Sequence, residues 1–197
     1  MSLVLASGSA SRKTLLSAAG VDYTSDPADL DEASLMAQLR ARGADAAHVA
    51  QELAVAKTQH VSRRHPGALV LGGDSVISFD GKLLSKCADL AGARALLREL
   101  SDREHLLVSA AALARDGQTL WQHASLCRMR MRNLSDAFLD DYLDREGIAI
   151  LSCVGCYRYE GLGAQLFERV EGDYFSVLGL PLLPVLAALR EQKVMAS

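Results

Sequence analysis

The chain has 197 residues, of which half are hydrophobic and 23% are charged, as is typical of a globular protein with a sizeable core. The formal net charge of −3 excludes a protein that coats nucleic acid through its overall charge, so affinity for phosphate must come from a local cluster of cations. No apolar run reaches the length of a membrane span, and the first residues lack a signal-peptide pattern. We therefore expect a cytoplasmic protein with no membrane or nucleic-acid partner.

The first informative stretch joins a short apolar run, Leu3 to Ala6, to a loop of small residues from Ser7 to Ser11. Arg12 and Lys13 then open a helical pattern, which Gly20 ends. A strand–loop–helix joint presents backbone N–H groups and the positive end of a helix dipole to an anion. Two cations there are unfavourable unless an anion is bound, so we interpret the joint as a phosphate site. An ordinary loop with two solvated cations is the alternative.

Two further helices are predicted after a polar loop from Asp22 to Asp31. The first, Ala33–Arg42, has apolar residues at helical spacing. Asp45 can cap a longer helix that runs to about Arg63. Lys57 lies one residue from the apolar face of that helix, which by itself predicts a flanking surface lysine.

The second informative stretch is Ala68–Phe79, in which two β-rich runs flank Gly72, Gly73 and Asp74. An ionised aspartate in a buried strand is costly without a partner. Glycines beside it allow the close approach of another backbone or of a ligand. We therefore predict a functional carboxylate stabilised by a metal ion or by cations. A bend at the end of the strand is the alternative.

The rest of the chain mixes hairpins with helices. The predicted elements are a turn at Asp80-Gly81 with a return strand from Lys82 to Leu84, a helix capped by Asp89 that runs through Leu100, strands at His105–Ala114 and Leu120–Met131 joined by Asp116-Gly117, a helix from Ser135 to near Glu146, an irregular β-like segment at Ala149–Gly163, a strand at Gln165–Val170 and a final helix from Pro181 to about Gln192. This order predicts an α/β fold with a mixed central sheet and flanking helices, as a single domain over residues 1–197.

The four cysteines include one Cys-x-x-Cys spacing, Cys153 to Cys156. A structural zinc site would need a second pair of ligands, and neither Cys87 nor Cys127 has a neighbouring ligand at suitable spacing. A redox dithiol would be expected at the start of a helix. We predict small, partly buried thiols and keep a redox or metal-binding module as an alternative.

Taken in order, these landmarks resemble the Maf-like nucleoside triphosphate pyrophosphatases over nearly the whole chain. The motifs that carry the resemblance are Leu5 to Lys13, which is similar to a Leu-Ala-Ser-x-Ser-Pro-Arg-Arg-like loop, the pair Asp31-Glu32, the helical Lys57, Gly72-Gly73-Asp74, Ser85-Lys86-Cys87 and the closing segment Gly172 to Leu182.

The resemblance implies hydrolysis of a nucleoside triphosphate to the monophosphate and pyrophosphate. It also implies a divalent metal cation (Mg, Mn or Co), two lobes around a cleft and, commonly, a homodimer. By the same resemblance Asp74 activates water as the base, and Glu32 and Asp74 hold the metal. The residues implied to bind phosphate oxygens are Ser7, Ser9, Arg12, Lys13, Lys57 and Lys86.

Several departures from the family pattern bear on base preference. Ser11 stands where one branch has arginine and another tryptophan, and Ser75 stands where threonine or glutamine is expected. Glu160 replaces the glutamine of the pyrimidine-preferring branch and resembles the 7-methyl-GTP branch, so 7-methyl-GTP is a candidate substrate. Ala10 and Cys87 replace prolines of the family pattern.

Glu160 is predicted to read a guanine-type base, because a carboxylate can accept hydrogen bonds from both N1 and the exocyclic N2 of guanine. An ion pair with Arg158 or Arg169 is the alternative role for this side chain. For the whole chain, the alternative function is a non-catalytic nucleotide-binding regulator of cell division. A pure binder would not need a base such as Asp74.

Overall fold

The structure, a computed structural model, describes residues 2–196. Contacts divide the chain into two compact units. The first contains the described parts of Met1–Ser75, Val108–Leu126 and Asp173–Ser197, and the second contains Val76–Leu107 and Cys127–Gly172. Three long strands each begin in one unit and end in the other, namely β3 (Leu69–Phe79), β5 (Glu104–Arg115) and β6 (Gln118–Met131). Two units agree with the two lobes that the family resemblance implies.

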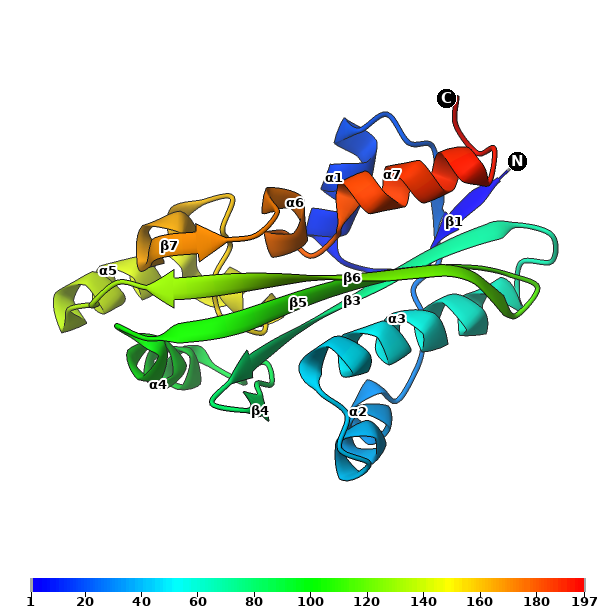
Figure 1. Ribbon diagram of the computed structural model, residues 1–197. Coiled ribbons are helices and arrows are strands. Elements are labelled where there is room, and N and C mark those ends of the chain that lie inside the picture. Colours follow the sequence, from blue (N-terminus) through cyan, green and yellow to red (C-terminus); the bar gives the residue numbers. More distant parts are fainter. Residues whose placement is uncertain (1, 197) are drawn as a thin grey trace. The chain divides into compact units, whose positions relative to one another are not determined.

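The remaining elements alternate between strands and helices. They are β1 (Leu3–Leu5), α1 (Ala10–Ala18), β2 (Thr24–Ser25), α2 (Glu32–Ala41), α3 (Ala46–Ser62), β4 (Lys82–Leu83), α4 (Leu90–Leu100), α5 (Asp136–Glu146), the 3-10 helices η1 (Gly147–Ser152) and η2 (Leu162–Leu166), β7 (Phe167–Glu171), α6 (Tyr174–Val177) and α7 (Leu182–Glu191) (Figure 1). Among the described residues, no helix has the length and apolar character that crossing a bilayer requires.

The sheet is mixed, as predicted. Its strands pair in the order β2-β1-β3-β5-β6-β7, and β4 pairs with β3. β1 runs parallel to both β2 and β3, whereas β4 is antiparallel to β3 and β7 is antiparallel to β6. The predicted α/β class with flanking helices is therefore confirmed.

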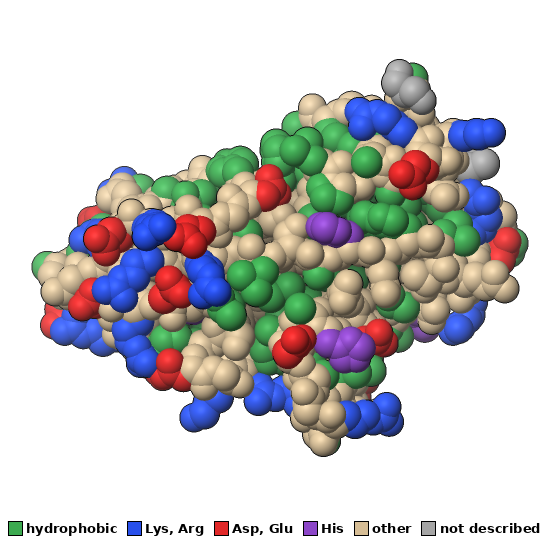
Figure 2. Space-filling view, in the orientation of Figure 1, with side chains coloured by type: hydrophobic (Ala, Val, Ile, Leu, Met, Phe, Trp, Pro, Cys, Tyr) green, Lys and Arg blue, Asp and Glu red, His purple; other side chains and the backbone are tan. Residues whose placement is uncertain are grey.

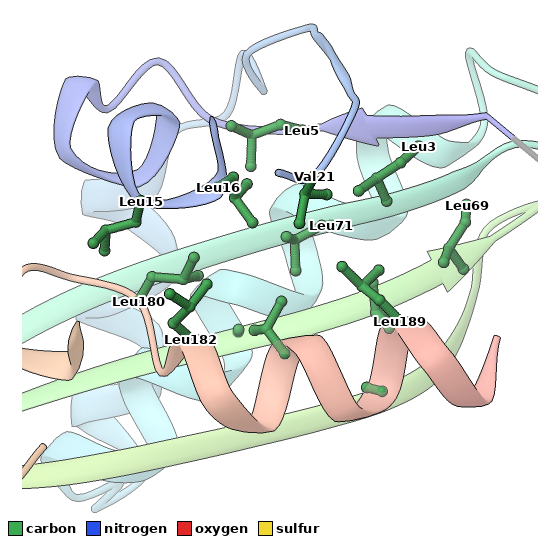
Figure 3. Close-up of a cluster of buried hydrophobic side chains, with 14 residues drawn as sticks. Leu3, Leu5, Leu15, Leu16, Val21, Leu69, Leu71, Leu180, Leu182 and Leu189 are labelled. Carbon is green, nitrogen blue, oxygen red and sulfur yellow. The ribbon is translucent and has the colours of Figure 1, made fainter. Parts of the chain in front are cut away.

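In the first unit, β1 and β3 send alternate side chains to opposite faces of the sheet. Helices α1 and α7 cover one face and α3 covers the other (Figure 1). The core on the α1 and α7 face is drawn in Figure 3 and includes Leu3, Leu5, Leu15, Leu16, Leu69, Leu71, Leu182 and Leu189. The core on the opposite face contains Val4, Ala6, Val61, Ala68 and Val70. Odd-numbered residues of both strands thus face α1, and even-numbered ones face α3.

Helix α1 begins earlier than the sequence predicted, at Ala10 instead of Arg12. Ser9 is its N-cap, and the Ser9 hydroxyl accepts a hydrogen bond from the backbone N–H of Arg12 at 3.4 Å. A serine in this place satisfies one of the N–H groups that a helix start leaves without a partner. The small residues up to Ser11 therefore belong partly to the helix, and Arg12 lies in its first turn.

The segment Ala149–Gly163 is not β-like, contrary to prediction. It contains most of η1 and the first residues of η2, separated by turns. At Gly163 an added Cβ would lie 2.4 Å from the carbonyl oxygen of Arg158, so the chain folds back on itself too tightly for an extended strand. The strand that follows, β7, accordingly begins at Phe167, two residues later than expected.

In the second unit, exposed ion pairs connect α4 to α5. Arg94 donates to Asp140 at 2.8 Å and to Asp136 at 3.0 Å. In Figure 2, Lys and Arg side chains alternate with Asp and Glu over this unit. Exposed pairs contribute only about 0–1 kcal/mol each. The packing of α4 and α5 is therefore stabilised mainly by their buried sides, which include Leu97 and Leu139.

The four cysteines all lie in the second unit, and none of them forms a disulfide. Cys127 and Cys156 are buried, and Cys87 and Cys153 are half-buried. Burial is the main cause that raises the pKa of the Cys156 thiol to about 12, so this side chain is protonated at neutral pH. Across residues 2–196, no group of three or more His, Cys, Asp or Glu side chains could hold a metal ion.

His105, on β5, is buried beside Tyr157 and Phe167 in the second unit. Only 2% of the residue is exposed, and its Nε2 lies 2.9 Å from the Tyr157 hydroxyl. The Nδ1 atom is buried without a hydrogen-bond partner among the described residues. Burial lowers the pKa of His105 from its ordinary value of 6.5 to about 4. The folded protein therefore holds a neutral imidazole where the unfolded chain would bind a proton.

We expect the free energy of unfolding to fall as the pH drops from about 6.5 to about 4. In that window the unfolded chain binds a proton at His105 that the folded protein does not, which amounts to about 3 kcal/mol at the acid end. Chemical denaturation at several pH values measures this slope. The variant His105→Phe, which has no titrating group, should show a shallower slope; an unchanged slope would contradict the assignment.

Candidate functional site

A group of polar side chains lies at the carboxyl end of β1, where the chain enters α1. β1 pairs with β3 only from Leu69 to Leu71, and β3 continues to Phe79. The backbone N–H of Ala6 donates to the carbonyl of Leu71 at 2.7 Å, and the chain then leaves the sheet. Ligands of parallel sheets bind at the carboxyl ends of the strands, so the polar groups from Ser7 onward lie where a site is expected.

The part of β3 that extends past β1 keeps the alternation of the core. Gly72 faces α3, where an added Cβ would lie 2.3 Å from Oγ1 of Thr58. Gly73 faces the other way, with its Cβ position 3.2 Å from Nε of Arg12. The two glycines thus allow close approach on both faces, as predicted. Because β3 is continuous through Asp74, the alternative of a bend at the strand end is wrong.

Two carboxylates converge on one lysine on the α3 face. Nζ of Lys57 lies 2.5 Å from Oδ1 of Asp74 and 2.8 Å from Oε2 of Glu32. Lys57 and Asp74 are only 9% and 8% exposed. Lys57 is therefore not the surface lysine that its helix position predicted. The ion pair supplies the partner that a buried aspartate needs.

Arg12 reaches the opposite face of β3 and is held by three acceptors. Nε donates to the carbonyl of Gly179 at 2.8 Å, Nη1 to Oγ of Ser7 at 3.2 Å and Nη2 to Oγ of Ser75 at 3.1 Å. Burial lowers the pKa of Arg12, and the negative charges of Asp74 and Glu32 act in the opposite direction. An arginine stays protonated in proteins, so this is a fixed, nearly buried positive charge.

The serines of the loop build its structure. Oγ of Ser7 accepts from the backbone N–H of Ser9 at 3.2 Å as well as from Arg12, and Ser9 caps α1. Lys13 is half-exposed, and among the described residues its ammonium has no ion-pair partner. The loop therefore offers one cation fixed by three hydrogen bonds and one without an ion-pair partner among the described residues.

Glu32 and Asp74 are the residues of this group that could hold a divalent metal. Mg²⁺ is commonly bound by one or two carboxylates, with water and substrate phosphates completing its shell. Two convergent carboxylates fit that mode, although no cluster of three metal-ligating side chains exists among residues 2–196. Lys57 bonds one oxygen of each carboxylate, so it keeps their two negative charges together.

Known proteins are similar to this chain over nearly its whole length. The family model described as "Maf-like protein" matches residues 2–192. The chain belongs to the Maf-like family. It is 45% identical to a protein of Granulibacter bethesdensis named "Nucleoside triphosphate pyrophosphatase", over 99% of each chain. It is 50% identical to a protein of Mesorhizobium japonicum named "7-methyl-GTP pyrophosphatase", over 95% of this chain and 94% of the other. A Brucella suis protein with the latter name is 48% identical, over 97% and 96%.

The first unit of this Maf-like protein brings together most of the predicted site residues. They are Ser7, Ser9, Arg12, Lys13, Glu32, Lys57, Asp74 and Ser75. Ser11 lies half-buried in the first turn of α1. Lys86 and Glu160 belong to the second unit, and both are exposed.

Within residues 2–196 no ion pair joins Glu160 to either arginine of the predicted alternative, although Glu146 and, more weakly, the charge of Glu160 raise the pKa of Arg158. Arg158 donates twice to Oε2 of Glu146, at 2.8 Å from Nε and 2.5 Å from Nη2. Arg169 pairs with Glu171. The exposed carboxylate of Glu160 is thus bonded by neither arginine.

Sequence reasoning missed two groups that support Arg12, one near the C-terminal end of the chain and one in its middle. Gly179 supplies a carbonyl, and Ser109 bonds Ser75 at 2.9 Å. Two signals could have found them. Ser109 is a hydroxyl within the otherwise apolar run from Leu106 to Ala114, and position 179 is a glycine, which its φ of +99° in the structure favours.

Proposed function

We propose that this Maf-like protein is a nucleoside triphosphate pyrophosphatase, which hydrolyses its substrate to the monophosphate and pyrophosphate. The observation that carries the proposal is the buried carboxylate of Asp74, which shares Lys57 with Glu32, together with the fixed cation Arg12 bonded to the neighbouring residue Ser75. Hydrolysis of a phosphoanhydride needs a base and charge neutralisation in one place, and this group of side chains provides both. The names of the relatives point to the same reaction.

Asp74 is the base in this proposal. Lys57 bonds its Oδ1, which leaves Oδ2 to accept a proton from the attacking water. Lys57 keeps the carboxylate oriented between turnovers. A divalent cation held by Glu32 and Asp74 would add charge neutralisation at the phosphate oxygens and lower the pKa of bound water.

The cations serve the triphosphate and the departing pyrophosphate. Arg12 donates three of its five N–H groups to the protein, which leaves one on each terminal nitrogen for phosphate oxygens. Lys13 adds a second positive charge at the start of α1, where the helix dipole also favours an anion. Ser7 and Ser9 preserve the shape of the loop, and Lys86 is a further cation that we propose binds phosphate oxygens.

The test is pyrophosphate release from a panel of normal and modified triphosphates with Mg²⁺, Mn²⁺ or Co²⁺. We expect release of monophosphate and pyrophosphate in equal amounts, and only when a divalent cation is present. Release of single phosphates would indicate a different bond specificity. Tight binding of triphosphates without any release would favour the alternative function, a non-catalytic nucleotide-binding regulator.

A guanine-type base, with 7-methyl-GTP as the leading candidate, is the preference we propose. Glu160 supports it, because a carboxylate accepts from both N1 and N2 of guanine, whereas uracil and thymine flank one N–H with two carbonyl oxygens. A positive ring methylated at N7 would add attraction to the carboxylate. Two of the relatives named above are called 7-methyl-GTP pyrophosphatases.

The variant Glu160→Gln should shift kcat/KM toward pyrimidine triphosphates, because an amide both donates and accepts hydrogen bonds. Steady-state kinetics on guanine and pyrimidine triphosphates measure the ratio. Glu168→Gln is a matched control, since Glu168 is an exposed carboxylate of the same unit. A base profile that is the same in wild type and Glu160→Gln would remove Glu160 from the substrate site.

Three further expectations stay predictions. They are a cytoplasmic location, a homodimer and a single domain over residues 1–197. Light scattering of the purified protein would test the homodimer.

A further inference from the structure

A row of serine hydroxyls runs from the guanidinium of Arg12 into the core of the first unit. Nη2 of Arg12 lies 3.1 Å from Oγ of Ser75, which lies 2.9 Å from Oγ of Ser109. Oγ of Ser109 in turn lies 2.7 Å from the carbonyl oxygen of Ser176. Ser109 and Ser176 are fully buried, so the inner half of the row is shielded from solvent.

The direction of every hydrogen bond in this row follows from counting protons. A carbonyl oxygen only accepts, so the single proton of the Ser109 hydroxyl goes to Ser176. Ser109 must then accept the hydrogen bond from Ser75, and the hydroxyl proton of Ser75 is the one donated in that bond. Ser75 is left with lone pairs only, which is what the N–H of Arg12 requires. A chain polarised in one direction strengthens each of its members.

The far end of the row is anchored by the segment around α6. The carbonyl of Ser176 also accepts from the backbone N–H of Gly179 at 3.0 Å. Oδ2 of Asp173 accepts from both the N–H and the hydroxyl of Ser176 at 2.7 Å. The same short segment thus supplies the end of the serine row and, through the carbonyl of Gly179, the acceptor for Nε of Arg12.

We propose that Ser109 is a positioning residue for the pyrophosphatase reaction. It does not touch substrate. Because Ser109 accepts the proton of Ser75, the Ser75 oxygen can only accept a hydrogen bond from Arg12. This bond holds the guanidinium so that its two remaining N–H groups can donate to phosphate oxygens. This inference rests on the proposed function and assigns a role to a residue that lies 97 positions from Arg12 in the chain.

Without the Ser109 hydroxyl, Ser75 is free to turn its proton toward the carbonyl of Gly179, 3.5 Å away, or toward Arg12 itself. In the second case an O–H dipole would point at a guanidinium N–H, which is repulsive. The guanidinium would then lose one of its three supports and sample more orientations. The affinity for phosphate would fall equally for every nucleotide, because the phosphate groups are the same whatever the base.

The experiment measures binding of inorganic pyrophosphate by calorimetry to wild type, Ser109→Ala, Arg12→Ala and the double variant. We expect Ser109→Ala to weaken binding about 3- to 10-fold, the usual effect of one neutral hydrogen bond. In the Arg12→Ala background the same substitution should have no further effect, because its target is gone. Purely structural damage would lower affinity by the same factor in both backgrounds and would overturn the proposal.

Ser62→Ala is the matched control. Ser62 is a fully buried serine of the same unit, and its hydroxyl also makes two hydrogen bonds, at 3.0 Å to Gln59 and 2.9 Å from Gly117. It should lower the melting temperature about as much as Ser109→Ala and leave pyrophosphate affinity unchanged. If Ser109→Ala does not fold, Ser75→Ala removes the next hydroxyl in the row and must show the same dependence on Arg12.

The outcomes separate this inference from the proposed function. If wild type releases no pyrophosphate from any triphosphate, the proposed function fails. If wild type is active and binds pyrophosphate, and Ser109→Ala binds it equally well, only the positioning role of Ser109 fails.

Discussion

Replacing Asp74 with asparagine should lower turnover about 10²- to 10⁴-fold and leave triphosphate affinity nearly unchanged. Asparagine keeps the shape of aspartate and an oxygen that Lys57 can bond, so the site should retain its geometry. The amide oxygen can still contact the divalent cation, and what the variant loses is the ability to take a proton from water. Single-turnover kinetics and calorimetry with an α,β-methylene triphosphate analogue measure the two effects separately.

Asp31→Asn is the matched control for this change. Asp31 precedes Glu32, is exposed and caps α2, with Oδ1 accepting from the N–H of Ser34 at 3.0 Å. An asparagine caps a helix about as well as an aspartate, so this variant should keep both turnover and affinity. Wild-type turnover in Asp74→Asn would refute the assignment of the base.

Replacing Arg12 with alanine should reduce kcat/KM about 10²-fold on every triphosphate, which is the combined effect of two charge-assisted hydrogen bonds of roughly 1.5 kcal/mol each. The variant also leaves Ser7, Ser75 and Gly179 without the donor they share. The melting temperature should therefore fall as well. Steady-state kinetics across the base panel and calorimetric melting measure the two losses.

Two substitutions serve as comparisons for Arg12→Ala, one as a control and one as a second cation proposed to bind phosphate. Arg190→Ala removes an exposed arginine from the last turn of α7 and should leave kinetics unchanged. Lys86→Ala, in the second unit, should weaken activity on all bases alike. A loss confined to one base in Arg12→Ala would mean that Arg12 reads the base and that its phosphate role is wrong.

Much of the fold followed from local patterns. The capping aspartates Asp45 and Asp89 and the turns at Asp80-Gly81 and Asp116-Gly117 all lie where predicted. These features depend on a few neighbouring residues, so local chemistry was enough to place them. The segment Ala149–Gly163 was mistaken for β structure, because its tight folding depends on the contact between Gly163 and the backbone of Arg158.

The candidate site, like the fold, could be predicted from the sequence only in part. Buried Asp74 beside two glycines, and the cationic loop at Arg12, could be singled out from residue chemistry, since an uncompensated charge in an apolar strand calls for a partner. The sequence could not say that the partner is Lys57, which helix periodicity placed on the surface. Periodicity reports which face a helix buries, and a residue at the edge of that face is decided by what packs against it.

By itself, then, the sequence determined the mixed α/β class, the family and the chemistry-bearing residues of the loop and of β3. Only the tertiary structure decided how they are connected. The alternation of β3 sends Asp74 to Lys57 and Glu32 on one face, and Ser75 to Arg12 on the other. The partners come from segments up to 167 residues apart, as in the bond from Arg12 to Gly179. Hydrogen-bond partners at such separation leave no periodic trace in the chain, because they are brought together by packing and not by local conformation.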